Sequence, residues 1–426
     1  MSWLLYNLIG IFFRLGIRPY FDLQVDGLDN YSESPSSLVV ANHKRDLDSV
    51  LIATVLYYHN GILPPSTPVS FMADENLFQP GFLGNWIKGP ALLKKALQPI
   101  SLSYILRKLH AHPIGKLDFH SVPVHDALRI IKENDDNHEL KDIIKEEALE
   151  GLLGESSFGY PGMTISEFFD REGYPREKID SRNFKPEFRK SVKKSKLYAV
   201  KDQLGKFVQL LNDGAILYIT PEGTLTKNGM LGPLKDSLLI LIDEADENVT
   251  IVPTNITYDF TKTGKTKIFV NIGEEISGLE ELNRKERSSN LRRSILGLTT
   301  INLGQVASLQ LKSAEEAGRD KIKLGDFYER VLEKLEYFKR EGYNLDDDLS
   351  DQKSIERRWE SFINYCLKRG VFDREEGRSR GEEDLLTLSS DLGYDRSEIP
   401  RGYRRDPINY CANEIKALEK VGLINL

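Results

Sequence analysis

Short, mostly apolar runs recur along the chain and are separated by amphipathic or polar segments. Each run is about five residues long and rich in Val, Ile and Leu, which is typical of strands covered on both faces. A helical pattern precedes one of them and ends at Asn212-Asp213-Gly214. Strands that alternate with helices predict an α/β fold with a mostly parallel sheet covered by helices. The predicted strands are residues 37–41, 69–73, 215–219, 249–253 and 267–271.

Changes in this pattern divide the chain into three predicted parts. Residues 1–35 begin with an apolar helix, and residues 36–280 carry the α/β pattern. Residues 281–426 show helical periodicity and charge runs without a clear strand, so a helical C-terminal region is expected. Within the middle part, residues 126–196 are polar and helical, which predicts an inserted segment.

The N-terminal helix is amphipathic, and its apolar stretch of about 11 residues is shorter than the roughly 20 that a spanning helix needs. Its polar residues recur every three or four positions and share one face, which predicts a helix in a membrane interface with arginines toward the headgroups. A helix packed on the protein's own core has the same periodicity and is the alternative. The polar face comprises Asn7, Gly10, Arg14 and Arg18, and the apolar remainder comprises Trp3, Leu4, Leu5, Leu8, Ile11, Phe12 and Leu15.

Composition and missing motifs narrow the chemistry. The chain of 426 residues has a net charge of -7, which argues against a dedicated nucleic-acid binder. Cys366 and Cys411 are too few for a disulfide framework or a four-cysteine zinc site. Gly264-Lys265-Thr266 lacks the first glycine of a phosphate-binding loop, and no dinucleotide fingerprint is present. We therefore expect no cofactor, and a covalent serine or cysteine mechanism has no support.

The segment after the strand 37–41 carries the first chemical candidates. Functional loops in α/β sheets lie at the carboxyl ends of strands. His43 and Asp48 are five residues apart, so their side chains can meet across a strand-to-helix turn. An aspartate on one imidazole nitrogen fixes the tautomer and leaves the other nitrogen to take a proton from an attacking hydroxyl. A capping or surface role for the pair is the alternative.

A second candidate loop, Pro221-Glu222-Gly223-Thr224, closes the strand 215–219. Gly223 lets the backbone approach a ligand closely, and exposed amides in such a turn can bind an anion. Glu222 can accept hydrogen bonds from hydroxyl groups. A plain turn at the end of a strand is the alternative.

These pieces and Val252-Pro253, in this order, make the chain resemble the glycerolipid acyltransferase superfamily over roughly residues 36–275. Its members include glycerol-3-phosphate acyltransferase and 1-acylglycerol-3-phosphate acyltransferase. The resemblance implies that residues 36–280 form an acyltransferase domain, with His43 as the general base and Asp48 orienting it. It implies direct attack of the acceptor hydroxyl on an acyl thioester, without a metal. Glu222, Gly223 and Thr224 would hold the glycerol-phosphate acceptor, and Pro253 would lie near it.

Two departures from the family pattern concern the acceptor phosphate. Leu225 stands where the family usually has an arginine, and the nearest cation in sequence is Lys227. The usual arginine of the second block is replaced by Lys116, or by Arg107 as the competing candidate. Lysine provides a point charge rather than a two-pronged clamp. An acceptor other than a glycerol phosphate therefore stays open, as do a thioesterase and a non-catalytic lipid-binding or scaffold protein.

Two further clusters bear on partners. The inserted segment ends in six cations that can face anionic lipid or an acyl carrier protein, with a solvated helix face as the alternative. They are Lys185, Arg189, Lys190, Lys193, Lys194 and Lys196. A His-x-His pair can bind zinc, but prolines interrupt this histidine cluster, and no metal is predicted. Its members are His110, His112, His120 and His125. The expected partners are a membrane surface, with the protein peripheral or monotopic on its cytoplasmic face, a glycerol-phosphate acceptor, and acyl-CoA or acyl carrier protein as donor.

Overall fold

The computed structural model describes most of the chain, which divides into two compact units. Unit 1 comprises residues 1–72, 104–112 and 207–426, and unit 2 comprises residues 73–103 and 113–206. The described residues are 2–31, 36–59, 61, 67–79, 82, 90–91, 93, 101–114, 121–132, 138–153, 162–170, 178–246, 248–279, 281–377, 383–389 and 406–425.

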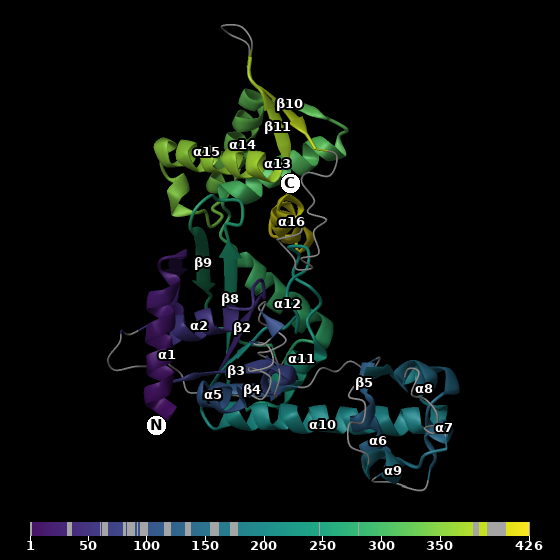
Figure 1. The fold of residues 1–426 in the computed structure, drawn as a ribbon. Helices are drawn as coiled ribbons and strands as arrows, with labels where there is room; N and C mark the ends of the chain where they lie inside the picture. Colours follow the sequence, from purple (N-terminus) through teal and green to yellow (C-terminus); the bar gives the residue numbers. More distant parts are fainter. Residues whose placement is uncertain are drawn as a thin grey trace. The chain divides into compact units, whose positions relative to one another are not determined.

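A seven-stranded mixed sheet forms the centre of unit 1 (Figure 1). Its order is β1-β9-β8-β2-β7-β3-β4, and only the β8–β9 pair is described as antiparallel, so the sheet is mostly parallel. The buried strand β2 lies between β7 and β8, with Val40 opposite both Ile219 and Pro253. The strands are β1 (Phe21–Asp26), β2 (Ser37–Ala41), β3 (Val69–Asp74), β4 (Ala111–Ile114), β7 (Ile216–Ile219), β8 (Thr250–Tyr258) and β9 (Thr266–Ile272).

Helices flank this sheet, so the predicted α/β fold is confirmed. Helix α2 (Asp48–Tyr57) contacts β7, and α12 (Arg284–Gly297) contacts β8 and α11 (Asp236–Glu244). All five strands predicted from the apolar runs are present, within a few residues at their ends. The edge strand β1 was not predicted, because its Phe-Asp-Leu-Gln-Val-Asp sequence is half polar and half exposed.

The N-terminal helix α1 (Ser2–Ile17) packs on α2 with its polar face. The Asn7 amide donates to the Tyr57 hydroxyl at 2.9 Å, and Gly10 lies against the Tyr58 ring. Arg14 stacks over the same ring, with 5.6 Å from its Cζ to the ring centroid. The apolar positions Leu8 and Phe12 are instead 59% and 79% exposed. Asn7, Gly10 and Arg14 thus pack within the protein, as in the alternative of a helix on the protein's own core, because Tyr57 and Tyr58 at the end of α2 offer polar and cation–π partners.

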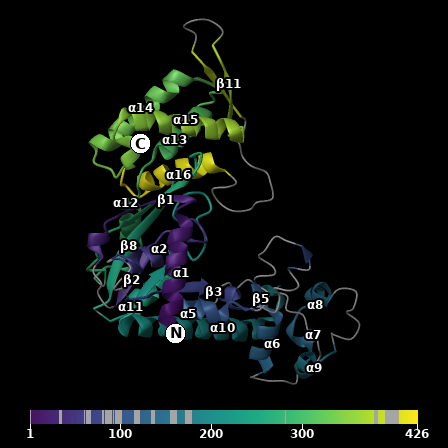
Figure 2. The ribbon, with the colours of Figure 1, turned by 60° about the vertical axis from the view of Figure 1, so that its left-hand side comes forward.

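The C-terminal region is helical, as predicted, but it also contains strands. Figures 1 and 2 show α16 (Pro407–Lys420) beside α13 (Leu303–Glu316). Helices α14 (Leu324–Arg340) and α15 (Gln352–Arg369) complete the helical part. The prediction that no strand follows residue 280 is wrong, because a three-stranded sheet is built from short segments, two of them charged. These are β10 (Lys321–Lys323), β11 (Phe372–Glu375) and β12 (Leu385–Leu388).

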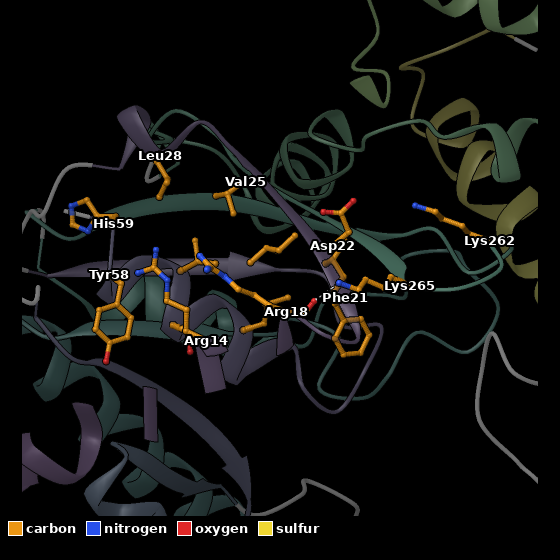
Figure 3. A pocket seen from close by; sticks show the side chains of 15 residues that line it. Arg14, Arg18, Phe21, Asp22, Val25, Leu28, Tyr58, His59, Lys262 and Lys265 are labelled. Carbon is orange, nitrogen blue, oxygen red and sulfur yellow. Dashed lines mark hydrogen bonds between the residues drawn. The ribbon is translucent and has the colours of Figure 1, made fainter. Parts of the chain in front are cut away.

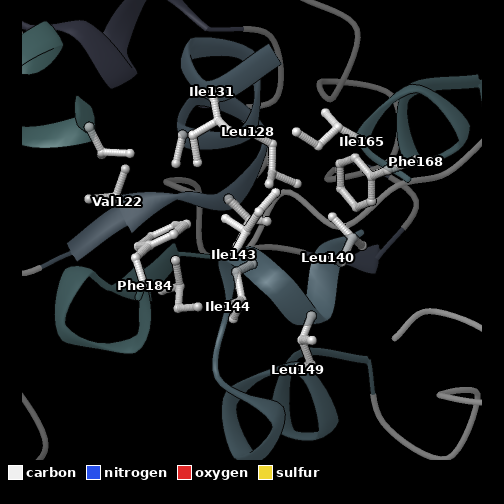
Figure 4. Packing of buried hydrophobic residues seen from close by; sticks show 14 residues of the cluster. Val122, Leu128, Ile131, Leu140, Ile143, Ile144, Leu149, Ile165, Phe168 and Phe184 are labelled. Carbon is white, nitrogen blue, oxygen red and sulfur yellow. The ribbon is translucent and has the colours of Figure 1, made fainter. Parts of the chain in front are cut away.

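Unit 2 contains the predicted inserted segment and has its own hydrophobic core, centred on Leu128, Ile143 and Phe168 (Figure 4). Its strands β5 (Ser121–Pro123) and β6 (Lys178–Asp180) pair antiparallel. Its helices are α6 (Val124–Lys132), α7 (Leu140–Ile143), α8 (Glu146–Leu153), α9 (Ile165–Asp170) and most of α10 (Pro186–Asn212), while α5 (Ser103–Lys108) falls mainly in unit 1. Short 3-10 helices occur at Leu28–Asn30, Glu75–Phe78, Ser181–Asn183 and Asp347–Leu349.

No helix in the described part of the chain combines the length and the apolar character needed to cross a membrane.

Candidate active site

The candidate site lies in unit 1, at the carboxyl ends of β2 and β7. Directly after β2, the Asn42 side chain continues the strand pairing, because it accepts from the Ile256 amide at 2.8 Å and donates to the Ile256 carbonyl at 3.0 Å. This pair of hydrogen bonds to the backbone of β8 fixes the point at which the chain leaves the sheet. The next residue, His43, is thereby held at the sheet edge.

His43 and Asp48 meet across the turn between β2 and α2, as predicted. Nδ1 of His43 lies 3.1 Å from Oδ2 of Asp48, and Asp48 is fully buried. The same oxygen accepts from the backbone amides of Lys44 at 2.6 Å and Arg45 at 2.8 Å. The His43 side chain is 18% exposed. With Nδ1 turned to the carboxylate, Nε2 is the nitrogen that can take a proton.

Tyr258, at the end of β8, completes the surroundings of Asp48 and was not predicted as a site residue. Its hydroxyl donates to Oδ1 of Asp48 at 2.5 Å. Burial and the neighbouring Asp48 carboxylate raise the pKa of the Tyr258 hydroxyl well above its ordinary value, so it remains a donor. Both oxygens of Asp48 are thus held by protein donors, which fixes the carboxylate that orients His43.

Tyr258→Phe is expected to lower kcat for the reaction proposed below about tenfold and to leave KM unchanged, because a hydrogen bond to a charged group contributes about 1.5–3 kcal/mol. The matched control is Tyr218→Phe. The buried Tyr218 hydroxyl lies near the same carboxylate but has no hydrogen-bond partner among the described residues. Steady-state kinetics of both variants would test this, and equal losses in the two would contradict it.

The Glu222 carboxylate lies beside the His43 backbone and accepts hydrogen bonds from three protein donors. It accepts from the His43 amide at 3.3 Å, the Thr226 hydroxyl at 2.9 Å and the Gly232 amide at 3.0 Å. Burial raises its pKa, while these three donors counteract the shift. Glu222 is only 5% exposed, so its geometry is that of a positioning residue for the His43 backbone.

Gly223 is in the left-handed region, at φ +64°, and its amide donates to the Thr220 carbonyl at 3.0 Å. An ideal Cβ there would meet only the Lys235 side chain, at 3.5 Å, so the positive φ is what favours glycine. This contact places the exposed Lys235 beside the Pro-Glu-Gly-Thr loop. Sequence reasoning missed Lys235 because it lies 12 positions after Gly223, beyond the loop.

The remaining predicted residues are more scattered. Thr224 and Lys227 are exposed on the same loop, whereas Pro253 is buried inside β8 and packs toward Gly273. Arg107 is exposed on α5 and contributes, after burial and His110, to lowering the pKa of His112. Lys116 lies outside the described residues.

Helix α16 supports both site loops from the C-terminal region, a connection that sequence reasoning did not anticipate. The Lys44 ammonium pairs with the Glu414 carboxylate, and both side chains are buried. Gln305 of α13 donates to the other Glu414 oxygen at 2.7 Å. The Asn413 amide also donates to the Asn228 carbonyl at 2.9 Å, beyond the Pro-Glu-Gly-Thr loop.

Within the described part of the chain, no three His, Cys, Asp or Glu side chains gather closely enough to hold a metal ion. His110 and His112 belong to unit 1, His125 belongs to unit 2, and His120 is outside the described residues.

The comparison with protein-family models agrees with the resemblance found in the sequence. A family model described as Acyltransferase matches residues 22–91. A search of the curated proteins found no significant match. Among solved structures, the 1-acyl-sn-glycerophosphate (LPA) acyltransferase PlsC from Thermotoga maritima is similar at 18% identity and a TM-score of 0.32, over 68% of this chain and 78% of that one. That similarity is too low to support a conclusion. The segment that matches the Acyltransferase family model includes His43, Asp48 and their strand-to-helix turn.

Proposed function

We propose that the protein is an O-acyltransferase that moves a fatty acyl group from an acyl thioester to a hydroxyl of glycerol 3-phosphate or 1-acylglycerol 3-phosphate. The observation that carries this proposal is the imidazole of His43, which is held through Nδ1 by the buried Asp48 at 3.1 Å. The family match of residues 22–91 supports acyl transfer as the type of reaction.

In this reaction the oxygen of the acceptor hydroxyl attacks the thioester carbonyl carbon, while Nε2 of His43 takes the hydroxyl proton. The carbon–sulfur bond of the resulting tetrahedral adduct breaks, and the departing thiolate takes the proton back from His43. The products are an ester and a free thiol. Asp48 stabilises the transient imidazolium. Because the acceptor hydroxyl attacks the thioester directly, no acyl group is attached to the protein.

Lysines around the Pro-Glu-Gly-Thr loop are proposed to bind the acceptor phosphate in place of the missing arginine. Lys227 is exposed on the loop, and Lys235 lies against Gly223. The Thr224 hydroxyl and the Gly223 backbone offer uncharged contacts on the same turn. Arg107 and Lys116 remain predicted phosphate ligands of the second block.

The acyl donor is proposed to be acyl-CoA or acyl carrier protein. The cationic segment of α10 suits an acidic carrier or an anionic membrane, since Lys190, Lys193 and Lys194 are exposed. Arg189 instead donates to the Arg182 and Phe184 carbonyls at 3.1 and 3.4 Å, so it is partly engaged within unit 2.

A membrane surface is the proposed place of action, at the cytoplasmic face, with α1 as a docking element. Among the described side chains of this helix, the exposed large apolar residues are Leu4, Leu8, Phe12 and Leu15. These residues follow one another at spacings of three or four and line one side of the helix. This side of α1 can insert among lipid headgroups while its polar side stays packed on α2.

Phe12→Asp is expected to lower binding to phospholipid vesicles at least about tenfold, because burying a phenylalanine side chain contributes about 1.5–3 kcal/mol. Sedimentation with vesicles measures the change. Asn290→Asp, which adds the same charge at an exposed position of α12, serves as the control. Unchanged sedimentation of Phe12→Asp would show that α1 does not dock.

Activity with a panel of acceptors tests the proposed reaction. Acyl-CoA is supplied with glycerol 3-phosphate, 1-acylglycerol 3-phosphate or no acceptor, and both lipid products and free thiol are measured. Ester formation with a phosphorylated acceptor is expected. Thiol release and free fatty acid without an acceptor would indicate a thioesterase, and vesicle binding without thiol release would indicate a non-catalytic lipid-binding protein.

A further inference from the structure

A cavity of about 720 Å³ lies in unit 1, between α1, β1, α2 and the connection from β8 to β9. In Figure 3, Arg14 and Arg18 extend into its middle, with Tyr58 and His59 on the left and Lys262 and Lys265 on the right. A volume of this size is within the range of pockets that hold lipid-sized or drug-sized molecules. None of the residues predicted for catalysis or acceptor binding lines it.

The lining combines positive charge with apolar surface. Arg14, Arg18, Lys262 and Lys265 contribute four cations against the single carboxylate of Asp22, although the whole chain has a net charge of -7. The apolar part of the wall is formed by Leu23, Val25, Leu28, Leu51, Val55 and Ile268. A ligand complementary to this wall carries an anionic group joined to hydrocarbon.

Arg14 offers a hydrogen-bond donor that the described part of the protein does not satisfy. Its Nη1 is buried and has no hydrogen-bond partner among the described residues. The guanidinium is held over the Tyr58 ring, with Cζ 5.6 Å from the ring centroid, so its position is fixed by packing rather than by an acidic neighbour. A buried, unpaired N–H of a charged group is costly unless a ligand accepts it. A phosphate is a geometrically suitable acceptor for such a fork.

The helix that contributes Arg14 to the cavity also exposes Phe12 and Leu15, which do not line it. A smaller recess shares Phe21, Leu51 and Ile268 with the cavity and reaches Arg45 and Tyr258. Since Tyr258 bonds to Asp48, the cavity is a neighbour of the candidate active site without including it.

We propose that this cavity binds the phosphate head group of an anionic phospholipid, with Arg14 and Lys262 as ligands and hydrocarbon along Val25 and Leu28. The bound lipid is held beside the His43–Asp48 pair and is not consumed there. The site does not depend on acyl transfer, so binding and catalysis can fail separately.

Titration calorimetry of the full chain with dihexanoylphosphatidate, a phosphate lipid that stays monomeric, tests the proposal. Saturable binding is expected, with much weaker binding of dihexanoylphosphatidylcholine. Arg14→Gln and Lys262→Gln should each lower the affinity for dihexanoylphosphatidate at least about tenfold, as expected for loss of a charge-assisted hydrogen bond. Lys262→Gln does not disturb the packing of α1 on Tyr58. The control, Arg319→Gln, removes an exposed cation of unit 1 and should leave the affinity unchanged.

Three further arms separate lipid from other phosphate sources and from catalysis. Val25→Trp, which fills the apolar side, should weaken dihexanoylphosphatidate binding and spare inorganic phosphate. His43→Ala should retain dihexanoylphosphatidate binding even where acyl transfer is lost. The proposal would be overturned by equal affinity for the two dihexanoyl lipids, or by binding of inorganic phosphate or acyl-CoA without binding of dihexanoylphosphatidate. It would also be overturned by loss of dihexanoylphosphatidate binding in His43→Ala, or by full affinity in both Arg14→Gln and Lys262→Gln.

Discussion

His43→Ala is expected to reduce acyl transfer from a thioester by about 10³-fold, within the 10²–10⁴ that a positioned general base contributes. The imidazole is the group that takes the hydroxyl proton, because the other described side chain bonded to Asp48, Tyr258, is a hydrogen-bond donor with a raised pKa. The measurement is the initial rate of ester formation with saturating acyl-CoA and acceptor.

The variant should stay folded, because Asp48 keeps its other three donors when the imidazole is removed. These are the amides of Lys44 and Arg45 and the hydroxyl of Tyr258. His125→Ala, which removes a half-buried imidazole from unit 2, is the control and should retain full activity. If His43→Ala kept more than half of the wild-type rate at an unchanged unfolding temperature, the assigned base would be wrong.

Glu414→Ala is expected to lower the free energy of unfolding by about 3–5 kcal/mol, because it leaves the buried Lys44 ammonium without its carboxylate. It also removes the acceptor of Gln305. The loss is measured as a lower midpoint of urea unfolding.

Two companions show whether the loss comes from the unpaired charge. The double variant Lys44→Met/Glu414→Leu should recover most of the stability, since apolar replacements of both partners are often neutral. Lys416→Ala, on the same helix, removes an ion pair with Glu316 that is partly exposed, and should cost no more than about 1 kcal/mol. If Glu414→Ala and Lys416→Ala were equally mild, the Lys44–Glu414 pair would not hold α16 to the site.

The elements around the catalytic pair were predictable because their signals are local. The apolar run 37–41 predicts a buried strand, and the five-residue spacing of His43 and Asp48 predicts a meeting across one turn. Tyr258 and Glu414 were missed for the opposite reason. They are 210 and 370 residues from their partners Asp48 and Lys44, and a lone tyrosine or glutamate carries no local mark of such a contact.

Helix α1 shows a different limit of sequence reasoning. Periodicity separates its two faces, but it does not say which face packs inward. Two tyrosines decide this, because the Tyr57 hydroxyl accepts a hydrogen bond from the Asn7 amide and the Tyr58 ring stacks with the Arg14 guanidinium. Likewise, the sequence marks Glu222 as a polar group in a functional loop. Only the structure shows that its carboxylate accepts hydrogen bonds from three protein donors.

The central claim is that His43 activates a hydroxyl for direct attack on a thioester. The most direct test is to follow free thiol and ester product together, with and without glycerol 3-phosphate or 1-acylglycerol 3-phosphate. We predict that thiol and ester form in equal amounts, only when an acceptor is present, and that both vanish in His43→Ala. Thiol release that is independent of the acceptor, or ester formation that persists in His43→Ala, would contradict this account.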